Sequence, residues 1–228
     1  MKTKVIAVTN PINMEDIKTA SDLIGYTARV SAPNNQNNTA TVGGLLNYCL
    51  RHKHFSIFEM VNVVMEIETT RDISRQILRH RSFSFQEFSQ RYAEVDPEII
   101  RRETRVQDTK NRQNSLKIDK GVDTDILFNC NQETVWTCAI DNYKQALHAG
   151  IAKEQARALL PEGLTSTRMY MNGSLRSWIH YVLLRSGVET QKEHRDIAKQ
   201  IGKQLLEHFD FLGVIFEPIF RDDYSAES

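Results

Sequence analysis

The sequence predicts a mixed α/β fold, because segments with the two-residue period of a strand alternate with segments of helical period. From Val61 to Ile67 every second residue is a large apolar one, the pattern of a strand with one buried face. From Gln191 to Phe209 apolar residues recur three or four positions apart, which predicts an amphipathic helix. With 228 residues, 40% of them hydrophobic and 25% charged, we expect one globular domain spanning residues 1–228.

Charge and cysteine content narrow the class of protein. The 29 basic and 29 acidic residues cancel, which argues against a general nucleic-acid-binding protein. Cys49, Cys130 and Cys138 form an odd set without zinc-like spacing, which favours a reducing compartment. No apolar run is long enough for a signal peptide or a membrane span. We expect a cytoplasmic protein with no metal, no membrane partner and no nucleic-acid partner.

The first third of the chain predicts one strand and two helices. An apolar run at residues 5–8 predicts a short strand, and helical spacing covers residues 14–30. A second helix is expected over residues 41–51. His52 and His54 follow it, but neither a cysteine nor a carboxylate cluster accompanies them, so we expect no metal site there.

A further helix is expected directly after the alternating strand. Thr69 and Asp72 have the spacing of a capping box, which opens a helix. Arg71, Arg75 and Arg79 then recur every four residues and share one face. The helix leads into residues 79–92, which we expect to form a charged loop.

Residues 79–92 have an unusual composition for either a helix or a strand surface. They contain three arginines, one histidine, one carboxylate, three serines and three phenylalanines. Guanidinium groups bind two phosphate oxygens at once, hydroxyls add donors, and phenylalanine offers a flat apolar face. The combination suggests a nucleotide site. The alternative is a solvated basic turn with a surface pair between Glu87 and Arg91.

The middle of the chain predicts an exposed excursion followed by two helices. Residues at about 101–125 are polar, and we expect Arg101, Arg102 and Arg105 there to be solvated. An amphipathic helix is expected over residues 131–149, and a shorter one over 152–160. The buried stripe of the longer helix is expected to comprise Val135, Trp136, Ala139, Tyr143 and Leu147.

The last third predicts a strand, a helix that starts near Asn172, and the final helix described above. The strand is expected over residues 165–171, and Asn172 is a favourable helix cap. Trp178, Tyr181 and Leu184 are expected to face inward from the helix that follows. The charged tail from residue 221 is expected to fray.

The spacing Arg-His-Arg-x-x-Ser-x-x-Glu-x-Ser-x-Arg at residues 79–91 resembles the signature of the flavin-dependent thymidylate synthases. Gln86 stands where that family usually has asparagine, and Ile57 stands where a flanking motif, His-x-His-x-Ser-Pro, has proline. Two further similarities are an Ala-Arg pair before Leu-Pro at 156–161 and the set Asn172, Arg176, His180 and Arg185.

The resemblance implies an α/β (α+β) domain, a central sheet flanked by helices, that assembles as a homotetramer with active sites between subunits. It implies reductive methylation of dUMP to dTMP, with methylenetetrahydrofolate and NADPH as co-substrates and FAD as cofactor. No cysteine matches a motif, so we expect no covalent cysteine nucleophile and expect each cysteine to tolerate replacement by serine.

The resemblance also implies a set of site residues. Arg185 is the expected catalytic residue, placed beside the uracil to favour negative charge on the ring. The residues expected to bind dUMP are Gln76, Arg79, Glu87, Phe88, Ser89, Gln90, Arg91, Arg157 and Arg185. The residues expected to bind FAD are Ser31, Ser56, Arg79, His80, Arg81, Ser82, Glu87, Asn172, Arg176 and His180.

Two other functions fit the same residues. A flavin- and folate-dependent dUMP hydroxymethylase would use the same scaffold and differ in its product. A non-catalytic RNA- or DNA-binding module would place Arg79, Arg81 and Arg91 on phosphates and stack Phe83 and Phe85 on bases. The zero net charge counts against the second alternative.

Overall fold

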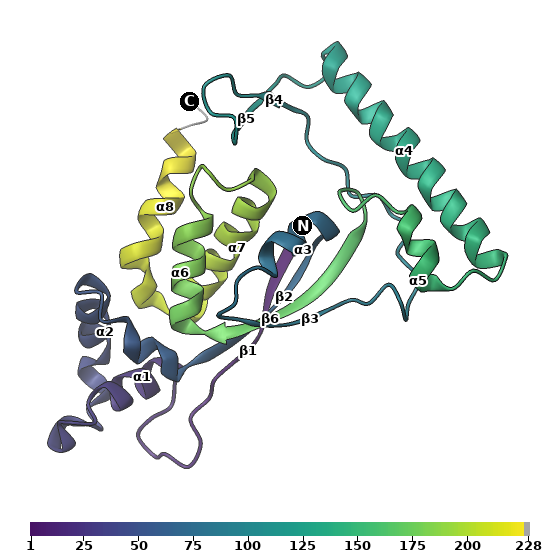
Figure 1. Cartoon of the computed structure of the whole chain (residues 1–228). Helices are drawn as coiled ribbons and strands as arrows, with labels where there is room; N and C mark the ends of the chain where they lie inside the picture. Colours follow the sequence, from purple (N-terminus) through teal and green to yellow (C-terminus); the bar gives the residue numbers. More distant parts are fainter. Residues whose placement is uncertain (226–228) are drawn as a thin grey trace.

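The computed structural model describes residues 1–225 and is built around a four-stranded antiparallel sheet of order β1-β2-β6-β3 (Figure 1). The two central strands pair along their whole length, from Asn62 opposite Ser174 to Thr70 opposite Ser166. The strands are β1 (Lys2–Val8), β2 (Asn62–Thr70), β3 (Ser84–Glu87) and β6 (Ser166–Ser174). This arrangement confirms the predicted mixed fold and the alternating strand.

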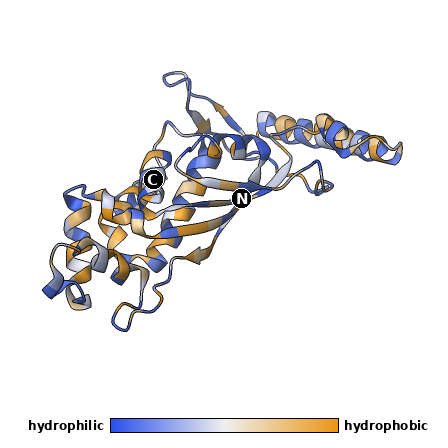
Figure 2. Cartoon of the chain, turned by 60° about the horizontal axis from the view of Figure 1, so that its bottom comes forward, coloured by the Kyte–Doolittle hydropathy of each residue, from blue (hydrophilic) through white to orange (hydrophobic). Residues whose placement is uncertain are grey.

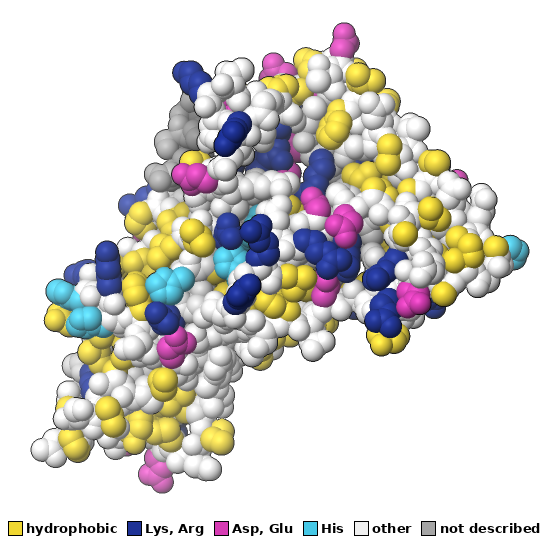
Figure 3. Space-filling model, in the orientation of Figure 1, with side chains coloured by type: hydrophobic (Ala, Val, Ile, Leu, Met, Phe, Trp, Pro, Cys, Tyr) yellow, Lys and Arg dark blue, Asp and Glu magenta, His cyan; other side chains and the backbone are white. Residues whose placement is uncertain are grey.

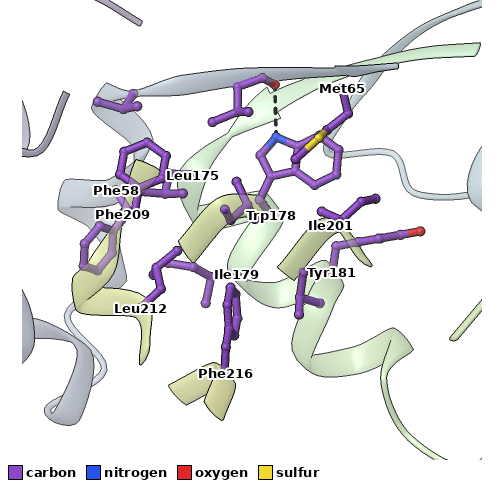
Figure 4. Packing of buried hydrophobic residues seen from close by; sticks show 14 of the residues in the cluster. Phe58, Met65, Leu175, Trp178, Ile179, Tyr181, Ile201, Phe209, Leu212 and Phe216 are labelled. Atoms are coloured by element: carbon purple, nitrogen blue, oxygen red, sulfur yellow. Dashed lines mark hydrogen bonds between the residues drawn. The ribbon is translucent and has the colours of Figure 1, made fainter. Parts of the chain in front are cut away.

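Helices cover one face of the sheet (Figure 1). They are α6 (Leu175–Arg185), α7 (Lys192–His208) and α8 (Gly213–Ser225). The apolar residues on the covered face of β2 and β6 are fully buried; they are Val63, Met65, Ile67, Met169 and Met171. Trp178 lies at the centre of this core, where its indole Nε1 donates a hydrogen bond of 3.0 Å to the carbonyl oxygen of Val63 (Figure 4). The helix predicted over residues 191–209 is α7, but it is not the last helix, because α8 follows it.

The N-terminal helices are α1 (Ala20–Ala28) and α2 (Val42–Arg51). The first was predicted to begin near residue 14, which is wrong. Thr19 accepts a hydrogen bond from the backbone N–H of Asp22, and the Asp22 carboxylate accepts one from the Thr19 N–H. This reciprocal capping box fixes the helix start after Thr19.

The expected capping box at Thr69 is also wrong. β2 continues through Thr70 because its ladder with β6 extends to that residue, so Thr69 is still part of the strand and is buried. Thr70 is the N-cap of α3 (Arg71–Ile77), and its hydroxyl donates to the Asp72 carboxylate at 2.6 Å. The helix itself was expected, and its Ile73 and Ile77 are fully buried in the core.

A second, smaller core lies under α4 (Asp123–His148) and α5 (Lys153–Ala156). The buried residues of α4 are Gln132, Trp136, Ile140 and Tyr143, so the predicted stripe was partly wrong. Val135 is 52% exposed, and the first nine residues of α4 include no buried side chain. In Figure 2 this long helix stands away from the body of the molecule and carries hydrophobic residues along its length.

The polar excursion forms a small hairpin, β4 (Arg105–Gln107) with β5 (Ser115–Lys117). Arg101 is exposed and pairs with Glu133. The expectation that the neighbouring arginines are solvated is wrong for Arg102 and Arg105, whose side chains are only 13% and 12% exposed. The carboxylates of Asp72 and Glu193 hold them, as described below.

The boundary between β6 and α6 also differs from the prediction. Asn172 lies within β6, opposite Val64 and Ser84, because the strand continues to Ser174. Ser174 is the N-cap of α6, and its hydroxyl accepts from the backbone N–H of Ser177. Trp178 and Tyr181 are buried as expected, whereas Leu184 is 61% exposed.

The C-terminal end of the chain is helical. The tail expected to fray from residue 221 continues α8 to Ser225, and residues 226–228 lie outside the described part. Within the described residues, no helix combines the length and hydropathy that crossing a membrane requires.

Candidate functional site

The signature segment begins at the end of α3 and crosses to the edge of the sheet. Ser84–Glu87 forms β3, so the expected charged loop is partly a strand. Because side chains alternate along a strand, Phe85 and Glu87 share one face and the exposed Gln86 lies on the other. The side chain of Gln86, the one position that departs from the family signature, therefore lies on the opposite face of β3 from Glu87.

Glu87 is held by three donors from inside the molecule. Its Oε1 accepts from Ser74 at 2.7 Å and from Thr167 at 3.1 Å, and Arg71 Nη1 lies 3.0 Å away. The side chains of Arg71 and Glu87 are only 7% and 13% exposed. Burial lowers the pKa of Arg71, and the charge of Glu87 acts in the opposite direction. The pair anchors the end of β3 to the start of α3.

Arginines surround a cleft of about 400 Å³ beside this pair. Arg71, Arg75 and Arg157 line it together with the buried Gln90. Exposed carboxylates at its rim pair with arginines, Glu162 with Arg75 and Glu154 with Arg91. Three forked cations around one cleft suit an anionic ligand such as a phosphate.

The cleft brings together the predicted residues Gln90 and Arg157, with Arg91 near its rim. Arg71 and Arg75 were not among the predicted site residues, although both line the cleft. The four-residue arginine repeat on α3 was the signal that could have identified them. The third member of that repeat, Arg79, lies beyond the C-terminal end of the helix and is exposed.

A second group of predicted residues forms around Arg185 at the end of α6. Its Nε donates a 2.8 Å hydrogen bond to Nε2 of His80. Burial, followed by the charges of Arg185 and Arg79, lowers the pKa of His80 to about 4. His80 is therefore neutral at pH 7 and can accept the bond. Since the bond uses Nε, the terminal nitrogens of Arg185 remain available for a ligand.

Two residues that sequence reasoning missed form the wall behind this group. The ring of Tyr181 meets the ring of His80 edge to face at 4.9 Å, and its hydroxyl lies 3.0 Å from Nε2 of His194. Both residues are fully buried. Burial, then the charges of Arg185 and His80, lowers the pKa of His194 to about 3, and burial raises the pKa of Tyr181. No spacing in the sequence connects His194 with the signature.

A third group gathers around the 3-10 turn Phe55–Met60, which packs against α6. Arg176 pairs with Glu59 at 2.8 Å, and the exposed His180 meets the ring of Phe55 at 4.9 Å. Hydrogen bonds from Ser174 and Arg176 lower the pKa of Glu59. Ser56 lies exposed on the same turn, so three predicted residues, Ser56, Arg176 and His180, are neighbours here.

Exposed cations lie next to these groups. Arg79 and Arg81 flank His80, and Figure 3 shows Lys and Arg side chains gathered over the middle of this face beside histidines. Ser82 is also exposed, and its carbonyl oxygen accepts a hydrogen bond from Ser177 on α6. These residues connect the second group with the third.

Other predicted residues lie apart from these groups. Ser31 is exposed beyond the end of α1, and Asn172 is exposed on the face of β6 that the helices do not cover. Phe88 and Ser89 are half-buried after β3. Within one chain, the predicted nucleotide residues thus divide between the cleft and the Arg185 group. Gln76 belongs to neither, and its amide donates to Gln191 at 2.7 Å.

Comparison with known proteins adds an independent observation. The family model described as "Thymidylate synthase complementing protein" matches residues 14–209. A flavin-dependent thymidylate synthase of Synechocystis sp. is 49% identical over 95% of this chain and 100% of that protein. A probable flavin-dependent thymidylate synthase of Paramecium bursaria Chlorella virus 1 is 47% identical over 92% of this chain and 95% of that protein.

A solved structure has the same fold. The UMP/dUMP methylase PolB from Streptomyces cacaoi, bound with 5-Br dUMP, superimposes with a TM-score of 0.77 at 23% identity. The match covers 92% of this chain and 91% of that one. The four-stranded sheet with its helical layer is therefore an arrangement that solved structures share.

Proposed function

The chain belongs to the family of flavin-dependent thymidylate synthases, and we propose from this that it methylates dUMP to dTMP. In this proposal methylenetetrahydrofolate supplies the carbon, NADPH is the reductant and FAD is the bound cofactor. The observation that carries the proposal is the arginine-lined cleft next to the signature strand. We also propose that residues 1–228 act as one catalytic domain in the cytoplasm, where the three free cysteines would stay reduced.

The cleft has the charge that a nucleoside monophosphate needs. Such a phosphate carries close to two negative charges at neutral pH, and bidentate guanidinium contacts bind it best. Arg71, Arg75 and Arg157 supply three guanidinium groups, and Gln90 supplies an amide. The related fold of PolB, whose structure was determined with 5-Br dUMP, supports a pyrimidine nucleotide as the ligand.

Arg185 would act on the pyrimidine ring. Negative charge builds up on the uracil as its C5 carbon becomes nucleophilic, and a fixed guanidinium beside the ring stabilises that charge. His80 holds the Nε side of Arg185 and does not compete for its terminal nitrogens. Because His80 is neutral, it adds no second positive charge that would displace the arginine.

Several residues fit a flavin dinucleotide. The exposed Arg79 and Arg81 could hold its diphosphate, and Arg176, His180 and Ser56 lie together beside them. When bound, the flavin supplies the hydride chemistry, whereas the protein contributes position and charge. The protein's own part is to hold the nucleotide, exclude water and stabilise charge on the ring.

We further propose a homotetramer whose active sites lie between subunits. The nucleotide residues of one chain divide between the cleft and the Arg185 group, and Ser31 and Asn172 lie apart from the other flavin residues. Residues of a second chain could complete each part. The exposed apolar residues of α4, which include Ile126, Leu127, Phe128 and Val135, provide a surface for such contacts.

The visible absorption spectrum of the purified protein is the first test. We expect flavin bands that NADPH bleaches faster when dUMP is present. With methylenetetrahydrofolate added, mass spectrometry should detect dTMP; a hydroxymethyl product would favour the hydroxymethylase instead. Absence of flavin even after addition of FAD, combined with salt-dependent binding of oligonucleotides, would contradict the enzyme function.

A further inference from the structure

The side chains of Gln76, Gln191 and Glu193 are linked by two hydrogen bonds, with Gln76 as the first donor and Glu193 as the last acceptor. Gln76 Nε2 donates to Gln191 Oε1 at 2.7 Å, and Gln191 Nε2 donates to Glu193 Oε2 at 2.9 Å. The other carboxylate oxygen of Glu193 accepts from Arg105. Gln191 is the N-cap of α7, and Glu193 lies in its first turn, so the backbone of one helix start holds both.

Glu193 can only accept hydrogen bonds in this setting. Its side chain is 10% exposed and lies between Arg105 and Arg102, with Arg102 Nη1 3.8 Å from Oε2. Burial raises the pKa of Glu193, but the hydrogen bond and the charge of Arg105 outweigh burial, and the net pKa is lowered. The group is therefore an ionised carboxylate at neutral pH, with no proton to donate.

The carboxylate decides which way both amides point. Gln191 must turn its NH₂ group toward Glu193, because two oxygens facing each other would repel. The Oε1 of Gln191 then faces Gln76, which in turn must present its NH₂ group to Gln191. The carbonyl oxygen of Gln76 is left on the outer side. The charge of Glu193 thus fixes the orientation of both amide groups.

We propose that Gln191 and Glu193 are positioning residues that fix the Gln76 amide so that its carbonyl oxygen accepts a hydrogen bond from the pyrimidine nucleotide. The inference rests on the proposed function and on the expectation, drawn from the family resemblance, that Gln76 contacts dUMP. The donor on the nucleotide is an N–H of the ring or an O–H of the sugar. Fixing the amide in advance removes the entropy that a free side chain would lose on binding.

The same chain of contacts explains why two arginines of the polar excursion are buried. Arg105 holds Glu193, and Arg102 holds Asp72 and Thr70 at the start of α3, the helix that carries Gln76. The base of the excursion thus connects both helices whose relative position sets the distance between Gln76 and Gln191.

A double-mutant cycle on the flavin-loaded enzyme tests the proposal. We expect Gln191→Leu and Gln76→Ala each to raise KM for dUMP about fivefold, the size expected for one hydrogen bond. For Gln191→Leu, the kcat, flavin content and Tm should stay near wild type. The double variant should match Gln76→Ala alone, because Gln191 acts only through Gln76. Arg101→Ala, an exposed change in the same excursion, is the control and should leave KM unchanged.

A second substitution guards against a folding defect. Glu193→Gln keeps the side-chain size and lets the amide of Gln191 turn over, so KM for dUMP should rise in the wild-type background and stay constant in the Gln76→Ala background. Additive effects on KM, or an unchanged KM in Gln191→Leu, would overturn the proposal. A wild-type enzyme that fails to bind dUMP would instead refute the proposed function itself.

A nucleotide analogue distinguishes whether the ring or the sugar of dUMP donates the hydrogen bond to Gln76. With 2′,3′-dideoxy-UMP, which lacks the 3′ hydroxyl, the effect of Gln191→Leu disappears if the sugar is the donor and persists if the ring is. An effect of Gln191→Leu on KM for dUMP is required in either case.

Discussion

Arg185 is held by a neutral histidine through its Nε, so its function depends on the shape of the side chain as well as on its charge. Lysine keeps the charge but has no group corresponding to Nε and no planar fork. We expect Arg185→Lys to lower kcat about 100-fold while flavin binding is retained. Steady-state dTMP formation measures the effect, and Arg195→Lys, a change at a half-buried position of α7, is the control. Activity within twofold of wild type would contradict the role of Arg185.

The buried His194 predicts how stability depends on pH. Its pKa in the folded protein is about 3, below the ordinary value of 6.5, so the unfolded chain takes up a proton that the native state does not. The stability that neutral His194 contributes is full above pH 6.5 and is lost as pH falls toward 3. His80 acts likewise between pH 6.5 and about 4. Each adds at most about 1.4 kcal/mol per pH unit to the slope.

We expect His194→Gln to flatten this slope. Its free energy of unfolding, measured by urea titration at pH 7, 6 and 5, should fall less with acid than that of wild type. The exposed His148→Gln should behave as wild type. An unchanged slope in His194→Gln would show that some other group takes up the proton.

Single residues of the site were predictable only where a spacing marked them. The signature placed Arg79 to Arg91 near one another, and the structure brings Gln90 and Arg157 into one cleft. Arg71 serves in the cleft and in the ion pair with Glu87, yet its only signal was a four-residue repeat. His194 had none, because its contact with Tyr181 depends on how α6 packs against α7.

Among the elements, β6 depends on a close approach at Gly173. A Cβ added there would lie 2.4 Å from Cδ1 of Phe83, whose ring packs edge to face on Trp178 at 4.7 Å. We expect Gly173→Ala to destabilise the protein by about 1–3 kcal/mol and to displace the start of β3. Thermal unfolding of the holoenzyme measures the loss. Gly44→Ala on α2, where a Cβ meets nothing within 4 Å, should not destabilise it. Equal Tm values would contradict the contact.

Elements were predictable where one face is buried and the other is solvated. The alternation in β2 and the period of α7 satisfy that condition, and both predictions hold. α4 does not, because Ile126, Leu127, Phe128 and Val135 are exposed, so their period carries no information about the core. The capping box at Thr69 failed because pairing with β6 continues to Thr70, one residue beyond the predicted cap.

At the scale of the whole molecule, α4 presents more apolar surface than a single chain uses. Leu127 is 62% exposed, and we expect Leu127→Glu to dissociate the proposed tetramer. The rate of dTMP formation should fall in proportion to the fraction of tetramer that is lost. Light scattering after size-exclusion chromatography measures the mass. Gln145→Glu makes the same change of charge at an exposed polar position of α4 and should leave the assembly intact. A tetramer that survives Leu127→Glu would exclude this part of α4 as a contact.

The full-length pairing of β2 with β6 has a consequence for folding. Residues 71–165 lie between the two strands, so the sheet can close only through contacts that are distant in sequence. High contact order of this kind slows folding toward milliseconds or seconds. The entropy of loop closure grows only with the logarithm of length, so doubling the intervening segment would cost about 0.6 kcal/mol. During synthesis, the antiparallel pair of β1 and β2 can form before β6, the other neighbour of β2, which emerges only in the last third of the chain.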